Sequence, residues 1–174
     1  EISSDNSNSK IINPFAPSGQ QWSDKSKYHY ALLAWYGIRN YLTSQGLLRS
    51  IDTALVNFSS ETRTSRTLEE ATRLAFTPQF GGTQINLEKI KKLFPPKIKS
   101  KIIFSLSDGE VYGWDSIEDE YIKIARENLY FHMQFGPDSV MSNALKKAGI
   151  PVYNIETGEE LPRLAVNLTR KTYE

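Results

Sequence analysis

Short apolar runs in this chain alternate with longer segments in which apolar residues recur every three or four positions. Four of the runs are nearly continuous and contain β-branched or aromatic residues, at 54–58, 102–106, 130–136 and 150–155. Runs of this kind are typical of strands that are buried on both faces of a parallel sheet. The pattern therefore predicts four such strands, with a fifth, short one at residues 1–4.

The segments between these runs predict helices. The longest extends from Lys25 to Gln45, and one face of it carries the apolar residues Tyr28, Leu32, Trp35, Ile38 and Leu42. Ser23 or Asp24 is expected to cap this helix, and residues 10–23, with two prolines and a glycine, are expected to form a loop. Further helices are predicted at 68–76, 85–94, 116–129, 139–149 and 158–174.

Strand and helix thus alternate with short connections. This order favours an α/β fold with a doubly wound, mostly parallel central sheet and helices on both faces. No internal repeat or linker divides the sequence, so we expect a single domain over residues 1–174. Residues 1–4 are too few for a central buried strand, which leads us to expect that the chain is part of a longer protein.

Composition and charge narrow the range of functions. The 174 residues are 39% hydrophobic and 24% charged, which is ordinary for a globular domain, and the net charge of +1 does not favour a nucleic-acid partner. The basic stretch at 91–101 lacks an aromatic array and is interpreted as a solvated loop. No apolar run reaches the roughly 18 residues of a membrane span. Cysteine is absent, which fits either compartment; we expect the cytoplasm, with the cell surface as the alternative.

Carboxylates and small polar residues follow several predicted strands, at the edge where parallel sheets bind ligands. The stretch DNSNS at 5–9 follows the first strand, and Ser107-Asp108-Gly109 follows a later one. Gly81-Gly82-Thr83 precedes a predicted helix. Oxygen donors of this kind suit a hard cation such as Mg²⁺, Mn²⁺ or Ca²⁺, and not zinc. The sequence contains neither of the glycine-rich motifs, G-x-G-x-x-G after a strand or G-K-[ST], that cradle nucleotide phosphates.

In D-x-S-x-S, alternate residues of an extended turn point the same way, so Asp5, Ser7 and Ser9 can converge on one point. This stretch, followed in order by GGT and SDG, resembles the metal-ion-dependent adhesion site of the von Willebrand factor A-type domain family, which includes the integrin I domains. The resemblance covers essentially the whole chain, and it matches the metal-binding residues Asp5, Ser7, Ser9, Thr83 and Asp108.

The resemblance implies a binding module and not a catalyst. It implies that the serines and Thr83 contribute hydroxyl oxygens, and that Asp5 and Asp108 act directly or through water. An Asp or Glu carboxylate of a partner protein would complete the shell of a bound Mg²⁺. The residues expected on the partner-binding face are Lys10, Gly82, Glu110, Tyr112 and Trp114.

Two positions depart from the family pattern. Asn8 stands where the family has glycine, and asparagine is the best substitute where the backbone dihedral φ is positive. Lys10 stands where the family has methionine, and its cation beside the metal would weaken metal binding. Lys10 therefore favours an alternative, in which the site is vestigial and the domain is a scaffold subunit that works with a ring-shaped AAA+ ATPase.

A further alternative is a Mg²⁺-dependent hydrolase or phosphoryl-transfer enzyme that uses Asp5 and Asp108. Such an enzyme needs a general base or a nucleophile, and the sequence specifies no dedicated one. His132 lies in an apolar run, which predicts a core histidine with satisfied hydrogen bonds.

Overall fold

The structure, a computed structural model, describes residues 10–12, 21–23, 26–77, 79, 82–93 and 101–173, and for the first two of these ranges it describes the backbone alone. Within them the protein is a mixed α/β fold with six α-helices, an antiparallel hairpin, a second two-stranded sheet and a three-stranded parallel sheet. None of the described helices is long and apolar enough to cross a membrane. The mixed α/β class predicted from the sequence is confirmed.

The chain forms two compact units. Unit 1 consists of the described residues of Glu1–Asn57, Thr64–Phe80 and Thr157–Glu174, and unit 2 of those of Phe58–Arg63 and Gly81–Glu156. The expectation of one domain over residues 1–174 stays a prediction.

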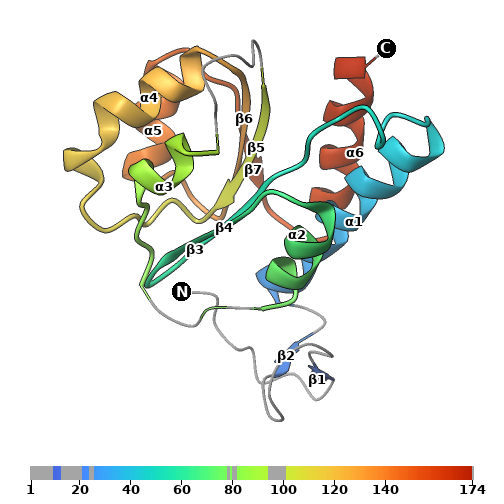
Figure 1. The fold of residues 1–174 in the computed structure, drawn as a ribbon. Coiled ribbons are helices and arrows are strands. Elements are labelled where there is room, and N and C mark those ends of the chain that lie inside the picture. Colours follow the sequence, from blue (N-terminus) through green and yellow to red (C-terminus); the bar gives the residue numbers. More distant parts are fainter. Residues whose placement is uncertain are drawn as a thin grey trace. The chain divides into compact units, whose positions relative to one another are not determined.

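Unit 1 contains three helices and a short hairpin. The helices are α1 (Lys27–Ser44), α2 (Leu68–Ala75) and α6 (Glu160–Tyr173). In the hairpin, β1 (Lys10–Ile12) pairs antiparallel with β2 (Gln21–Ser23), so the stretch predicted as a loop has strands at its two ends. Figure 1 shows α1 and α6 side by side.

α1 begins two residues later than predicted, at Lys27 instead of Lys25. Ser26, with extended backbone dihedrals, caps the helix, and its side chain accepts a hydrogen bond from the backbone N–H of His29 at 3.1 Å. Ser26 rather than Ser23 or Asp24 is the cap because it directly precedes the first helical residue. At the other end Gly46, with φ of 69°, takes the left-handed conformation that favours glycine after a helix.

Small residues allow close packing within unit 1. A Cβ atom on Gly37 of α1 would lie 2.9 Å from a methyl carbon of Val166 in α6. A Cβ atom on Gly158, just before α6, would lie 1.9 Å from the ring of Tyr30 in α1. The two helices therefore approach each other through positions where a larger residue would collide with its neighbour.

The two-stranded sheet formed by β3 (Leu55–Phe58) and β4 (Thr62–Ser65) corrects the prediction for this region. All four residues of β3 are half-buried, not buried on both faces of a parallel sheet. β4 lies in a stretch that the sequence indicated only as polar. Its inward side chains are the hydroxyls of Thr62 and Ser65, which bond to the backbone N–H groups of Asn86 at 2.8 Å and Leu55 at 3.2 Å, so no apolar alternation marks the strand.

Unit 2 is built on a parallel sheet with the strand order β5-β6-β7. Its strands are β5 (Ile102–Ser107), β6 (Leu129–Phe135) and β7 (Val152–Ile155). α4 (Glu118–Arg126) connects the first pair and α5 (Val140–Lys147) the second. Both helices lie on the same face of the sheet (Figure 1), as two right-handed crossovers in sequential order require. The short elements α3 (Leu87–Lys91) and η1 (Trp114–Ser116) complete the unit.

The two faces of this sheet differ in character. Phe104, Phe131 and Tyr153 form a row of aromatic rings on one face, with ring centroids 5.5 and 6.4 Å apart. The face toward α4 and α5 has apolar residues at its amino end, such as Ile103, which packs against the core of the unit. Toward the carboxyl end this same face becomes polar, and that change positions the candidate site described below.

One buried hydrogen bond joins two helices of unit 1. The Tyr28 hydroxyl of α1 donates to the backbone carbonyl of Ala75, the last residue of α2, and burial raises the pKa of this hydroxyl. We expect Tyr28→Phe to lower the free energy of unfolding by about 1–2 kcal/mol, because a buried carbonyl loses its donor. Chemical denaturation measures this, with Tyr112→Phe as a control at a side chain that is 78% exposed. Equal stability of Tyr28→Phe and wild type would contradict the assignment.

Candidate functional site

The predicted site residues fall into two groups. Asp5, Ser7 and Ser9 lie outside the described residues, and Lys10 lies in β1 with its side chain outside them. All of the others lie in unit 2: Gly82, Thr83, Asp108, Glu110, Tyr112 and Trp114. In the described part of the chain, no group of three or more His, Asp or Glu side chains could hold a metal ion. The predicted set has two carboxylates, of which only that of Asp108 is described, so this finding does not bear on it.

Asp108 lies directly after β5, at the carboxyl end of the parallel sheet, in a tight turn. The Ser107 hydroxyl accepts a hydrogen bond from the N–H of Gly109 at 2.9 Å, and Asp108 Oδ1 accepts one from the N–H of Glu110 at 3.4 Å. Gly109 has φ of 76°, a conformation that side-chain-bearing residues rarely adopt. The turn therefore fixes the backbone that carries the Asp108 carboxylate.

The structure brings the Thr83 segment and the Asp108 loop together. The backbone N–H of Tyr112 donates to the carbonyl of Thr83 at 2.8 Å, and the N–H of Gln84 donates to the carbonyl of Ser59, also at 2.8 Å. The Thr83 segment is therefore tied on one side to the loop after β5 and on the other to the turn after β3. Thr83 and Asp108 are half-buried.

The exposure of the residues expected on the partner face separates them into two kinds. Gly82, Glu110 and Tyr112 are exposed, as a binding face requires. Trp114 is not, because η1 turns its side chain into the core, where it is 4% exposed and packs edge-on against Tyr121 at 5.2 Å. The expectation that Trp114 borders the partner face is therefore corrected: it is a core residue, next to exposed neighbours in the same short helix.

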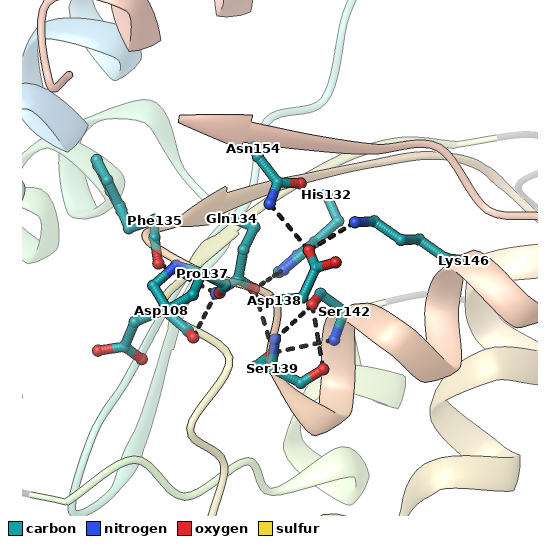
Figure 2. Close-up of polar contacts among 10 residues, drawn as sticks. All are labelled: Asp108, His132, Gln134, Phe135, Pro137, Asp138, Ser139, Ser142, Lys146 and Asn154. Carbon is teal, nitrogen blue, oxygen red and sulfur yellow. Dashed lines mark hydrogen bonds and ion pairs between the residues drawn. The ribbon is translucent and has the colours of Figure 1, made fainter. Parts of the chain in front are cut away.

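A row of buried polar side chains lies beneath this edge of the sheet, and Figure 2 shows the end of it that His132 and Gln134 form. His132 is fully buried, with Nδ1 3.1 Å from the Ser105 hydroxyl and Nε2 3.1 Å from Gln134 Oε1. The Gln134 nitrogen faces the carbonyls of Asp108 at 2.5 Å and of Phe135 at 3.1 Å, which assigns its amide orientation. Because an amide oxygen only accepts, His132 carries its proton on Nε2, and Nδ1 accepts from Ser105.

The row continues away from the edge through two tyrosines. The Tyr121 hydroxyl lies 3.4 Å from the Ser105 hydroxyl and 2.5 Å from the Tyr130 hydroxyl. Since the Ser105 hydroxyl donates its hydrogen bond to His132 Nδ1, the Tyr121 hydroxyl donates to Ser105 and the Tyr130 hydroxyl donates to Tyr121. Burial raises the pKa of both tyrosines and lowers the pKa of His132 to about 4. The prediction of a satisfied core histidine is confirmed.

The loop after β6 carries polar residues that the sequence analysis missed. Ser139 caps α5 in a reciprocal pair of hydrogen bonds with Ser142. Asp138 binds Lys146 at 2.5 Å and Asn154 at 2.9 Å, and the bond from Lys146 is the main cause that lowers the pKa of Asp138. Ser139 was recognisable as a serine directly before an amphipathic segment, and the signal for Gln134 was an amide inside an apolar run.

The donor chemistry of the described half of the site fits a hard cation. Asp108 offers a carboxylate and Thr83 a hydroxyl, both on loops joined by the Tyr112 hydrogen bond. Oxygen donors are what Mg²⁺ prefers, whereas zinc prefers nitrogen and sulfur.

Comparison with protein-family models, with curated proteins and with solved structures finds no match. The family resemblance therefore rests on the motif residues of the sequence and stays a prediction.

Buried His132 makes stability depend on pH. Its pKa of about 4 lies below the ordinary value of 6.5, so between these values the unfolded chain binds a proton that the folded chain does not. We expect the free energy of unfolding to fall by about 3 kcal/mol as the pH decreases from 6.5 to 4. Denaturation at a series of pH values measures this. His132→Gln should lose this contribution and His29→Gln should keep it; an unchanged pH profile in His132→Gln would refute the assignment.

Two glycines with the same backbone conformation allow the cost of backbone strain to be measured separately from the cost of overpacking. Gly109 and Gly136 both have φ of 76°, but a Cβ atom on Gly109 would lie 2.7 Å from Ser139 Cβ, whereas one on Gly136 would meet nothing within 4 Å. We expect Gly136→Ala to lower the free energy of unfolding by about 1 kcal/mol, from the left-handed backbone alone. Gly109→Ala should cost about 1–3 kcal/mol more, from overpacking. Equal losses in denaturant titrations would show that the Gly109 turn is not tightly packed.

Proposed function

We propose that this chain is a von Willebrand factor A-type domain that binds a partner protein through a divalent cation. The cation is Mg²⁺, with Mn²⁺ or Ca²⁺ as substitutes, held by oxygen atoms of Asp5, Ser7, Ser9, Thr83 and Asp108. The doubly wound sheet with helices on both faces is part of the same proposal. The order β5-β6-β7 supports the parallel part of this sheet, whereas helices on the second face belong to the proposal alone, since α4 and α5 lie on one face.

The observation that carries the proposal is the hydrogen bond from the Tyr112 N–H to the Thr83 carbonyl. Thr83 and Asp108 are 25 positions apart in the sequence, and each alone would be an ordinary cap or turn. The bond joins the two loops that carry the second and third motifs. This contact between the two segments supports the proposal, because the Asp108 loop follows the carboxyl end of β5, and ligands of such folds bind at that edge of the sheet.

The residues of this edge have distinct tasks in the proposal. When bound, the cation supplies an open coordination position for a carboxylate oxygen. The Asp108 turn and the Thr83 segment hold their oxygen atoms in place before the partner arrives, which lowers the entropic cost of binding. Tyr112, 78% exposed, offers a rigid aromatic surface to the partner, and exposed Glu110 lies two residues before it.

In the scaffold alternative, the same face binds the partner, and no metal ion takes part in the binding. Lys10, at a position where the family has methionine, favours it, and a ring-shaped AAA+ ATPase is then the proposed partner. The hydrolase alternative has less support, because His132 is enclosed, neutral at ordinary pH and engaged at both ring nitrogens. It is therefore not placed to act as a general base.

Thermal melting with metal tests the proposal. At a Mn²⁺ or Mg²⁺ concentration ten times the dissociation constant, a site present only in the folded state adds about 1.4 kcal/mol of stability. For a chain of 174 residues this raises the melting temperature by roughly 3–6 °C relative to EDTA. Asp108→Ala should lose the rise, while Asp115→Ala, an exposed aspartate in the same loop region, should keep it.

The result also separates the alternatives. A wild-type protein that melts at the same temperature with EDTA and with saturating Mn²⁺ would refute the metal site. Partner capture that then persists in EDTA would favour the scaffold. Hydrolysis of a phosphate ester that requires Asp108 would favour the enzyme.

A further inference from the structure

Gln134 occupies an unusual place for an amide side chain. It is the sixth residue of β6, is 0% exposed, and directs its side chain toward the loops beyond the strand (Figure 2). Its two N–H groups face three carbonyls, those of Asp108 at 2.5 Å, Phe135 at 3.1 Å and Pro137 at 3.1 Å, so one N–H is shared between two of them. A single side chain thus binds the loop after β5 and the loop after β6.

The oxygen of the same amide is also engaged. It accepts from His132 Nε2 at 3.1 Å and from the Ser139 hydroxyl at 3.2 Å. Ser139 in turn caps α5, so Gln134 connects the Asp108 turn with the beginning of that helix. The amide therefore lies at a point where three chain segments meet.

The Asp108 turn packs closely against Gln134 and Ser139. A Cβ atom on Gly109 would lie 1.9 Å from Ser139 Oγ and 2.7 Å from Gln134 Oε1. The backbone can approach so closely only because residue 109 is glycine with a positive φ. Two contacts therefore fix the position of Asp108. One is the hydrogen bond from Gln134 to its carbonyl, and the other is the close packing of Gly109 against Ser139.

An apolar residue would fill this space without the cost of burying an amide. Gln134 instead makes bonds whose backbone partners, apart from that of Phe135, lie in loops and not in the sheet. We infer that Gln134 is a positioning residue, which holds the main chain at Asp108 in the conformation that the carboxylate needs to bind a cation. The cation part of this inference rests on the proposed function; the part on loop conformation does not.

Three variants test this inference. Gln134→Met keeps the approximate volume and removes every amide hydrogen bond. Gln134→Glu keeps an oxygen acceptor for His132 and Ser139 but loses the N–H donors, and it serves if the methionine variant does not fold. Ser105→Ala is the matched control, because it interrupts the same buried row without touching the Asp108 loop.

Two measurements are made on each folded variant. Hydrogen exchange of the Gly109 and Tyr112 amides, in metal-free protein, reports the loop conformation, since these N–H groups bond to Ser107 and Thr83. Titration with Mn²⁺, followed by its electron paramagnetic resonance signal, reports cation affinity. We expect Gln134→Met to speed exchange of both amides severalfold and to weaken Mn²⁺ binding by about 10-fold or more. Ser105→Ala should leave both close to wild type.

Each outcome decides the inference. Wild-type exchange and affinity in a folded Gln134 variant would overturn it, as would equal losses in Gln134→Met and Ser105→Ala, which would indicate general loosening. If the wild type itself binds no Mn²⁺, the proposed function fails. The exchange data then decide alone: faster exchange only in the Gln134 variants supports the positioning role, and unchanged exchange refutes it.

Discussion

The polar side chains of Ser105, His132 and Gln134, on the helix-facing side of the parallel sheet, are buried, so each must find its hydrogen-bond partner within the protein. Leaving one such group unsatisfied costs about 1–3 kcal/mol. Ser105 and His132 satisfy each other, and His132 also binds Gln134. Gln134 then takes its remaining partners from loops at the carboxyl edge, including the carbonyl of Asp108 and the hydroxyl of Ser139. The need of buried Gln134 for hydrogen-bond partners thus helps to fix the conformation of the loops at the carboxyl edge, where ligands of α/β folds bind.

Elements with a strong apolar signal were predictable from the sequence, and elements built on polar contacts were not. The strands β5, β6 and β7 and the helix over 27–44 followed from runs and spacing, because burial of their apolar faces stabilises them. β4 was not predicted, because its inward residues, Thr62 and Ser65, carry hydroxyl groups that accept hydrogen bonds from backbone groups distant in sequence. The cap of the first long helix was misplaced by two or three residues, since several small polar residues precede it and only Ser26 adjoins the first helical residue.

For the candidate site, sequence reasoning located loops better than side-chain directions. Asp108 was expected at the end of a strand and lies there, because strand ends follow from where an apolar run stops. The predicted direction of the Trp114 side chain was wrong. The three-residue helix η1 determines this direction, and so short a helix leaves no periodic signal in the sequence. Gln134 was missed for a different reason. An amide within an apolar run shows that a buried partner exists, but the sequence does not indicate that this partner is a carbonyl 26 positions earlier.

The buried row has a direction, because the proton of each hydroxyl is committed to one neighbour. Tyr130 donates to Tyr121, Tyr121 to Ser105, and Ser105 to His132, whose other nitrogen donates to Gln134. Reversing one of these hydroxyls would leave two donors facing each other at the next position, so neighbouring hydroxyls have to reorient together. Its members are thus energetically coupled. Selection on each hydroxyl of this row therefore depends on which residue stands at the neighbouring position.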